Sequence, residues 1–208
     1  MRQWISSILL FLAGMGIGVW LWSMGREYID QRHDERVFDA DRESPPPPQA
    51  PMASQPLKMP RGEVLGRLTI PHIHLRAMVR EGDDDDTLDV ALGHIPSTAL
   101  PGQRGNVGVA GHRDTIFRHL GEVATNDEIQ LETPSATYTY KVDDMSIVTP
   151  QAVSVLAPGR RDQLTLVTCY PFHYIGSAPK RYIVKAHLVS QNQSAAVVRS
   201  TNRVQHQR

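Results

Sequence analysis

The chain has 208 residues, with 22 basic and 22 acidic side chains and a formal net charge of zero. This balance excludes the strongly basic composition typical of nucleic-acid-binding domains, so we expect no nucleic-acid partner. No glycine-rich phosphate-binding motif is present, and we expect no cofactor. The one cysteine, Cys169, excludes an intramolecular disulfide and any metal site built from several cysteines.

An uncharged segment from Gln3 to Gly25 lies near the start of the chain. Its length fits a transmembrane helix, which needs about 20 apolar residues, and tryptophans near both ends suit the membrane interfaces. The alternative is a cleaved signal peptide, whose apolar core is usually about 7–15 residues long and precedes a small-residue cleavage site. The sequence therefore predicts an uncleaved membrane anchor over residues 1–25. Arginines on both sides leave its orientation open.

Residues 26–61 are expected to form a linker. Its first part is charged, and fits either a short juxtamembrane helix or a solvated coil. The stretch from Ser44 to Pro60 is rich in proline, which favours extended polyproline geometry and a semi-rigid spacer. We expect a globular domain over residues 62–190 and a flexible polar tail over residues 191–208.

Short apolar runs separated by turn residues predict a mainly β domain. In chain order, the expected strands are Val64–Ile70, Leu75–Arg80, Asn106–Ala110, Glu128–Glu132, Thr137–Val142, Met145–Thr149, Leu164–Thr168 and Tyr182–Val189. Short helices are expected at Thr87–Leu92 and Thr115–Leu120. About eight short strands in a domain of this size indicate a sandwich or a barrel.

Three side chains near strand ends could carry chemistry. Cys169 follows the run Leu164–Thr168 directly, just as His112 follows Asn106–Ala110 after a single glycine. Arg181 begins the last strand and offers a planar set of donors that suits an oxygen anion. Each residue also has a plainer interpretation: a buried thiol, a loop histidine and a solvated arginine.

Two further groups could hold a metal ion. The run Asp83–Asp86 could bind calcium, but acidic residues there also suit the dipole of the following helix. His72 and His74 would share one face of a strand, yet no third ligand is apparent. The sequence therefore favours surface residues and no metal site.

Together, these residues resemble the sortase family. Thr165-Leu166-Val167-Thr168-Cys169 matches the TLxTC signature, Gly111-His112 matches an upstream GH element, and Arg181 stands twelve positions after the cysteine. The segment from Ile70 to Leu75 resembles the I-P-x-I-x-L opening of the domain, and Gly93-His94-Ile95-Pro96 resembles class D sortases. The resemblance extends from Arg61 to Val189.

The resemblance implies a closed eight-stranded sortase-type β-barrel with short helices, preceded by one N-terminal transmembrane helix. It implies attachment to the cell membrane through residues 3–25, with the catalytic domain outside the cytoplasm. It assigns Cys169 as nucleophile, His112 as acid and base, and Arg181 as the oxyanion-stabilising group.

The implied activity is that of a cysteine transpeptidase. Such an enzyme cleaves an LPxTG-like C-terminal sorting signal of secreted proteins and transfers the acyl fragment to an amine acceptor of the cell envelope. Two alternatives stay open: a cysteine hydrolase that uses water as the acceptor, and a non-catalytic membrane-tethered β-module.

Overall fold

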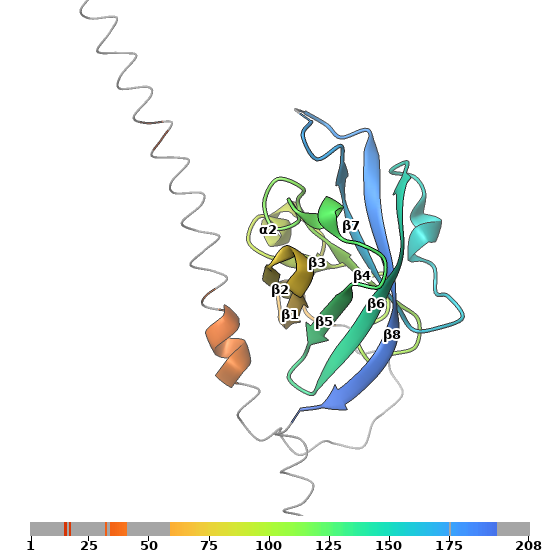
Figure 1. Cartoon of the computed structure of the whole chain (residues 1–208). Coiled ribbons are helices and arrows are strands. Elements are labelled where there is room, and N and C mark those ends of the chain that lie inside the picture. Colours follow the sequence, from red (N-terminus) through yellow and green to blue (C-terminus); the bar gives the residue numbers. More distant parts are fainter. Residues whose placement is uncertain are drawn as a thin grey trace, which may run out of the picture.

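The computed structural model describes residues 59–174 and 176–194, together with residues 15, 17, 32 and 34–40. Its largest part is a closed barrel of eight strands, which confirms the predicted mainly β barrel (Figure 1). The strands are β1 (Val64–Ile70), β2 (Leu75–Glu81), β3 (Leu92–His94), β4 (Asn106–Ala110), β5 (Glu128–Glu132), β6 (Ala136–Val148), β7 (Gln163–Tyr170) and β8 (Lys180–Gln193). The short helices are η1 (Pro71–Ile73), α2 (Asp85–Leu88), η2 (Leu120–Glu122) and η3 (Val153–Leu156).

The barrel is mixed, with the strand order β1-β2-β3-β4-β7-β8-β6-β5. The pairs β2–β3 and β4–β7 are parallel, and the other pairs are antiparallel. Because β4 and β7 are parallel, their carboxyl ends lie at the same edge of the sheet. The residues that follow each strand therefore meet there.

Successive side chains of each strand point alternately into and out of the barrel, and the inward-facing ones are mostly apolar. Leu68, Leu131 and Leu166 come from three different strands and are fully buried. In β4, Val107 and Val109 point inward, which leaves the positions between them on the outer face. Close packing of this interior fixes the register of each strand, since a slip by one residue would expose the whole apolar set.

Most predicted strands are confirmed, with two differences. The strands predicted at Thr137–Val142 and Met145–Thr149 form one strand, β6, which ends at Val148 and whose register shifts between Val142 and Asp144. Asp143 and Asp144, which separate the two predicted strands, therefore lie at a β-bulge within a continuous strand. The sequence reading also missed β3, since a three-residue strand gives almost no alternation pattern.

The predicted helices are only partly confirmed. The first begins earlier and is shorter than expected, because Asp84 caps α2 by accepting a hydrogen bond from the Thr87 backbone N–H. The prediction of a helix at Thr115–Leu120 is wrong, because residues 115–119 form turns. Phe117 N donates to His112 O, whereas Arg118 N donates to Thr115 O, so the bonds close turns of different sizes and not a repeating helical ladder.

Several predictions fall outside the described residues. These are the membrane anchor over residues 1–25, of which only Met15 and Ile17 are described, the proline-rich stretch up to residue 58, and the tail from residue 195. The described residues contain no helix with the length and apolarity that a membrane span requires. At the other end, β8 continues to Gln193, opposite Ala136, and so runs past the expected domain end at residue 190.

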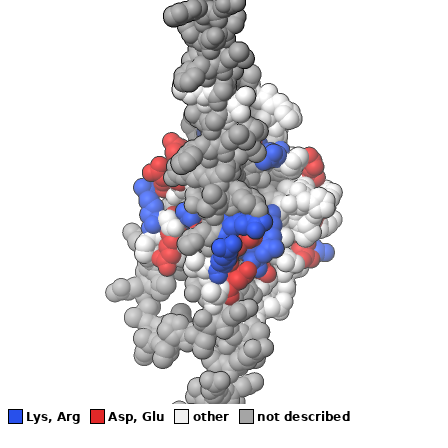
Figure 2. Space-filling view, turned by 90° about the vertical axis from the view of Figure 1, so that its left-hand side faces the viewer, with Lys and Arg blue, Asp and Glu red and all other residues white. Residues whose placement is uncertain are grey.

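Residues 34–40 are helical and pack against the outside of the barrel; we call them the N-terminal strap (Figure 1). Arg80 of β2 donates from both Nε and Nη2 to the buried carboxylate of Asp34, at 2.6 and 2.7 Å. Glu35 pairs with Arg76 of β2 at 3.2 Å. Figure 2 views this side of the molecule and shows basic and acidic side chains intermixed.

The strap also has an apolar contact. Phe38 is 1% exposed, and the guanidinium carbon of Arg67 in β1 lies 5.2 Å from its ring centroid. Arg67 also donates to Asp39 of the strap and to Glu132 of β5. Burial alone would lower the pKa of Arg67, but these two carboxylates outweigh it and raise that pKa, so the side chain stays cationic. Ionic and apolar contacts thus hold the strap on β1 and β2.

We expect Asp34→Asn to release the strap, because the replacement removes the charge from a buried, bidentate ion pair. Hydrogen exchange of the amides in residues 34–40 should become about tenfold faster, equivalent to about 1.4 kcal/mol. Asp39→Asn is the matched control, since Asp39 is 54% exposed and an exposed pair contributes little. Equal exchange in both variants and the unmodified chain would show that the buried pair does not hold the strap.

Candidate active site

Strand pairing brings His112 next to Cys169. In the parallel β4–β7 pair, Ala110 lies opposite Val167. The ladder continues one residue beyond β4, where Gly111 N donates to Val167 O at 3.2 Å. Continued by one more residue, the same offset brings the backbone of His112 level with Cys169, whose side chain lies on the outer face of the barrel by alternation.

The other neighbour of β7 brings in Arg181. In the antiparallel β7–β8 pair, Cys169 and Arg181 are direct register partners. The structure therefore gathers Cys169, His112 and Arg181 from three adjacent strand ends at one edge of the sheet. Their positions depend on the backbone ladder, and no ionic contact among the three is needed to bring them together.

Cys169 is half-buried, and an aromatic cluster lies near the same strand ends. Tyr170, Phe172 and Tyr182 form this cluster, with ring centroids 5.3–6.3 Å apart. Burial, followed by the charge of Asp144, raises the pKa of Tyr182, so its phenol stays neutral. Tyr182 is the register partner of Thr168 and packs with Phe172 against the core, so the cluster extends the apolar interior beneath the strand ends.

His112 is held more loosely. Its side chain is 34% exposed, and Nε2 lies 3.7 Å from Oδ1 of Asp89, which is itself 71% exposed. A pair so open to water is weak. The ring is thus accessible for proton exchange, while the backbone beneath it is fixed.

That backbone is fixed by a buried contact that the sequence did not indicate. Thr168 Oγ1 donates to Gly111 O at 2.7 Å and so ties β7 to the residue before His112. Glycine is required at 111, because a Cβ there would come within 2.6 Å of Leu92 and 2.7 Å of Phe117. The bond to Gly111 O thus explains the threonine, and the packing of Leu92 and Phe117 against residue 111 explains the glycine.

Arg181 is oriented by the loop before its own strand. Nη1 donates to Ala178 O at 3.3 Å and to Lys180 O at 3.0 Å. Among the residues that the structure describes, no carboxylate pairs with this guanidinium. The hydrogen bonds that this guanidinium makes within the described part of the chain thus all start from Nη1 and end on backbone carbonyls.

Arg113, the residue after His112, clamps the connection between β7 and β8. It donates from Nη1 to Pro171 O at 3.0 Å and from Nη2 to Tyr174 O at 2.6 Å and Gly176 O at 3.0 Å. Its guanidinium also lies 5.9 Å from the centre of the Tyr174 ring. Sequence analysis gave Arg113 no role, since nothing in the pattern showed that it reaches carbonyls about 60 residues away.

The outer face of β4 and β7 is open near the thiol and covered farther away. Ala110, Val167 and Cys169 are half-exposed. Toward the other end of the strands, a Cβ on Gly108 would come within 2.9–3.2 Å of Thr98, Ile95 and Leu156. The turn at residues 95–99 and the helix η3 thus cover this face at Gly108, next to its open part.

The candidate metal ligands are used in other ways. Burial alone would raise the pKa of Asp84, but hydrogen bonds from Thr87 and the charge of Arg61 hold it below its usual value, as expected for a helix cap. The expectation that His72 and His74 share a strand face is wrong, because His72 lies in η1 and His74 is its left-handed cap. Within the described ranges, no group of three or more acidic, histidine or cysteine side chains could hold a metal.

Arg113→Lys should loosen the β7–β8 connection, because lysine keeps the charge but lacks the planar fork that reaches three carbonyls. We expect protection from hydrogen exchange over residues 171–178 to fall on the order of tenfold, or about 1.4 kcal/mol. Arg118→Lys is the control, since Arg118 is exposed and its guanidinium bonds only to Thr115 O among the described residues. If both variants exchange like the parent chain, Arg113 is not a clamp.

Comparison with known proteins adds an independent line of support. The family model described as the Sortase domain matches residues 68–189. Sortase D of Bacillus subtilis (strain 168) is 37% identical over 124 residues, which are 59% of this chain and 63% of that protein. The chain thus spans somewhat less than two thirds of that relative's length.

Solved structures show the same architecture. A sortase D5 transpeptidase from Clostridium perfringens is 29% identical, with a TM-score of 0.58 over 64% of this chain and 82% of that one. Sortase E from Streptomyces avermitilis is 30% identical, with a TM-score of 0.58 over 67% of this chain and 99% of that one. The shared part corresponds to the barrel that carries Cys169.

Proposed function

Because the chain belongs to the sortase family, we propose that it is a cysteine transpeptidase whose reaction uses Cys169, His112 and Arg181. The observation that carries this proposal is the convergence of three strand ends. Arg181 is the register partner of Cys169, and the β4–β7 offset brings His112 to its other side. A nucleophile, a proton carrier and an anion donor are the groups that acyl transfer needs.

The reaction begins with attack of the Cys169 thiolate on the scissile carbonyl carbon. Negative charge then develops on the carbonyl oxygen, and the guanidinium of Arg181 donates hydrogen bonds to it. The bonds from Nη1 to Ala178 O and Lys180 O hold this guanidinium in place before the substrate arrives. Such preorganisation avoids reorientation during the reaction.

His112 carries the protons in both half-reactions. As an imidazolium, it protonates the leaving amine when the peptide bond breaks and the thioester to Cys169 forms. As neutral imidazole, it then takes a proton from the incoming amine, which attacks the thioester and releases the thiolate. The exposure of the ring allows both partners to reach it.

We propose an LPxTG-like sorting signal at the C-terminus of secreted proteins as the substrate. The signal would lie in an extended form along the open part of the outer face of β4 and β7, next to the turn at 95–99 and η3. The proposed acceptor is an amine of the cell envelope. The likeness to sortase D supports assignment to class D, and the apolar segment from residue 3 to 25 supports attachment to a membrane. We propose that the barrel lies outside the cytoplasm, as the resemblance to sortases implies.

The variant Arg181→Lys keeps the positive charge of the side chain but loses the planar arrangement of its donors. We expect it to lose about 2–4 kcal/mol of transition-state stabilisation, comparable with the loss of an oxyanion donor, because the planar fork is gone. The bell-shaped dependence of kcat/KM on pH should remain, since thiol and imidazole are unchanged. His112→Ala should instead distort that dependence and impair both half-reactions.

The measurement is kcat/KM against pH on a peptide that carries the sorting signal. Cys169→Ala is the reference for zero turnover, because the chain has no other thiol. Near-normal activity of Arg181→Lys would contradict the proposed oxyanion role of Arg181. Turnover by Cys169→Ala would contradict the proposed function as a whole.

Dependence on an added amine distinguishes transpeptidation from hydrolysis, because the protein residues would be the same for both. We expect the rate of product formation, or the ratio of amide to acid product, to rise with amine concentration. Mass spectrometry of the products measures this ratio. Formation of acid alone at every amine concentration would favour the hydrolase alternative.

A further inference from the structure

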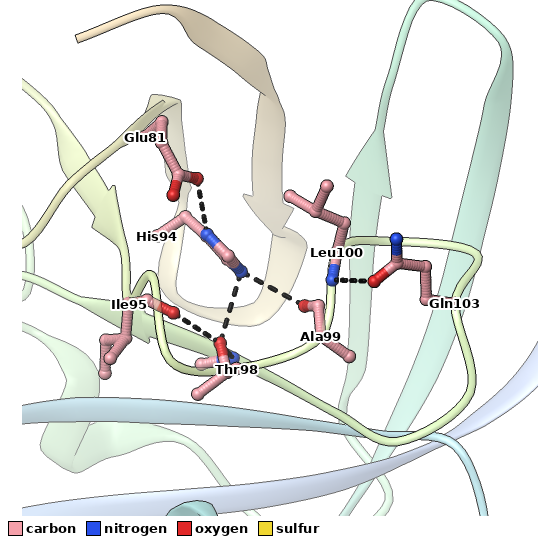
Figure 3. A network of polar contacts seen from close by, with 8 residues as sticks. Glu81, His94, Ile95, Thr98, Ala99, Leu100 and Gln103 are labelled. Atoms are coloured by element: carbon pink, nitrogen blue, oxygen red, sulfur yellow. Dashed lines mark hydrogen bonds and ion pairs between the residues drawn. The ribbon is translucent and has the colours of Figure 1, made fainter. Parts of the chain in front are cut away.

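A second histidine, outside the site described above, is buried in an ion pair. Glu81 of β2 and His94 of β3 are register partners in the parallel β2–β3 pair. Their side chains are 9% and 1% exposed, and His94 Nδ1 lies 2.6 Å from Glu81 Oε2 (Figure 3). The other ring nitrogen, Nε2, faces the turn at residues 95–99, at 3.1 Å from Ala99 O.

The hydrogen bonds around Nε2 show that it carries a proton. Ala99 O can only accept, so the 3.1 Å contact requires a donor on the histidine. Thr98 Oγ1 lies 3.2 Å from Nε2, but its single proton is donated to Ile95 O at 2.7 Å. That hydroxyl therefore accepts at its other contacts, including the bond from Gly108 N at 2.9 Å.

A second proton lies between Nδ1 and the carboxylate. Without it, the 2.6 Å contact would join two lone pairs. The pair then holds two protons and has no net charge. This fits its burial, because a buried net charge is costly unless it is paired.

Charged groups on the adjoining elements do not change this balance. Arg80, next to Glu81, donates to Asp34 of the N-terminal strap. Asp84, after β2, pairs with Arg61. Within the described part of the chain, Glu81 pairs with His94.

The turn that His94 holds is attached to β4, the strand that leads to His112. Ile95 N donates to Gly108 O at 2.9 Å, and Ala99 N donates to Asn106 O at 3.0 Å. Thr98 closes the same contact through its bond from Gly108 N. The turn therefore forms one flank of the outer face on which the proposed substrate lies.

We infer that Glu81 and His94 are positioning residues, and that the two protons they hold together fasten the turn at residues 95–99 against β4. The inference rests on the proposed function only for its effect on substrate binding. Loss of one proton would leave Nε2 facing Ala99 O as two acceptors and would bury a net negative charge. The turn would then detach from His94 while the strands beneath it remain paired.

Nitrogen-15 NMR of the histidine rings in the full chain tests the proton count directly. Near neutral pH, we expect a proton on His94 Nε2 and a second proton on Nδ1 or, by its carbon shift, on the Glu81 carboxyl. A total of one proton on the pair while the turn stays protected from hydrogen exchange would overturn the inference. This measurement needs no variant and no enzymatic activity.

Hydrogen exchange at one pH tests the link to the turn. His94→Ala should lower the protection of residues 95–99 at least fivefold, because it removes the donor to Ala99 O. Glu81→Gln should keep the protection, because the amide can donate to Nδ1 of a neutral His94 whose Nε2 still donates to Ala99 O. Unchanged protection in His94→Ala would also overturn the inference.

Peptide cleavage supplies the functional readout. We expect His94→Ala to raise KM about fivefold or more while kcat changes less, because the flank of the substrate face loosens and the reacting groups stay in place. His187→Gln is the matched control: His187 lies 2.7 Å from Asp143 in an exposed pair, and its replacement should leave KM unchanged. An equal loss in both variants, or a loss confined to kcat, would contradict a positioning role.

The two proposals fail in different ways. If the chain cleaves no sorting peptide, the NMR and exchange results still decide the proton count of Glu81 and His94. If cleavage occurs but the pair holds one proton, the transpeptidase proposal is unaffected and the positioning role is lost.

Discussion

The parallel pairing of β4 with β7 is the constraint on which the candidate site depends. Parallel strands end at the same edge of a sheet; here Cys169 lies near the end of β7, and His112 follows β4 by two residues. The offset between Ala110 and Val167 is set by the buried side chains on the inner faces of both strands, since a slip by one residue would expose them. The core packing of the barrel therefore determines that His112 comes beside Cys169.

The contacts that stabilise the site are made by the backbone that carries the reacting groups, and not by those groups with one another. His112 is open to water and has only a distant, exposed carboxylate beside it. By contrast, the bond from Thr168 to Gly111 is buried, and Arg113 binds three carbonyls of the neighbouring connection. A rigid backbone with accessible side chains suits a reaction in which one histidine must serve a leaving group and then an incoming amine.

The sequence predicted much of the barrel because its strands carry clear alternation. The bounds of β1, β4 and β5 agree with the structure, and the strand count is also correct, although one predicted pair is a single strand and β3 was missed. Long-range hydrogen bonds explain what could not be predicted. The clamp by Arg113 and the buried pair of Glu81 and His94 arise from register between distant segments, which leaves no local pattern in the chain.

The N-terminal strap has a consequence for the outer surface of β1 and β2. Asp34 and Phe38 are buried against these strands, where they contact Arg80 and Arg67. The side chains of these two arginines are 22% and 12% exposed. A shortened chain that begins after residue 40 would therefore leave two arginines of neighbouring strands without the carboxylate and the ring that cover them. The outer surface of the barrel at β1 and β2 is thus completed by residues that precede the domain in the chain.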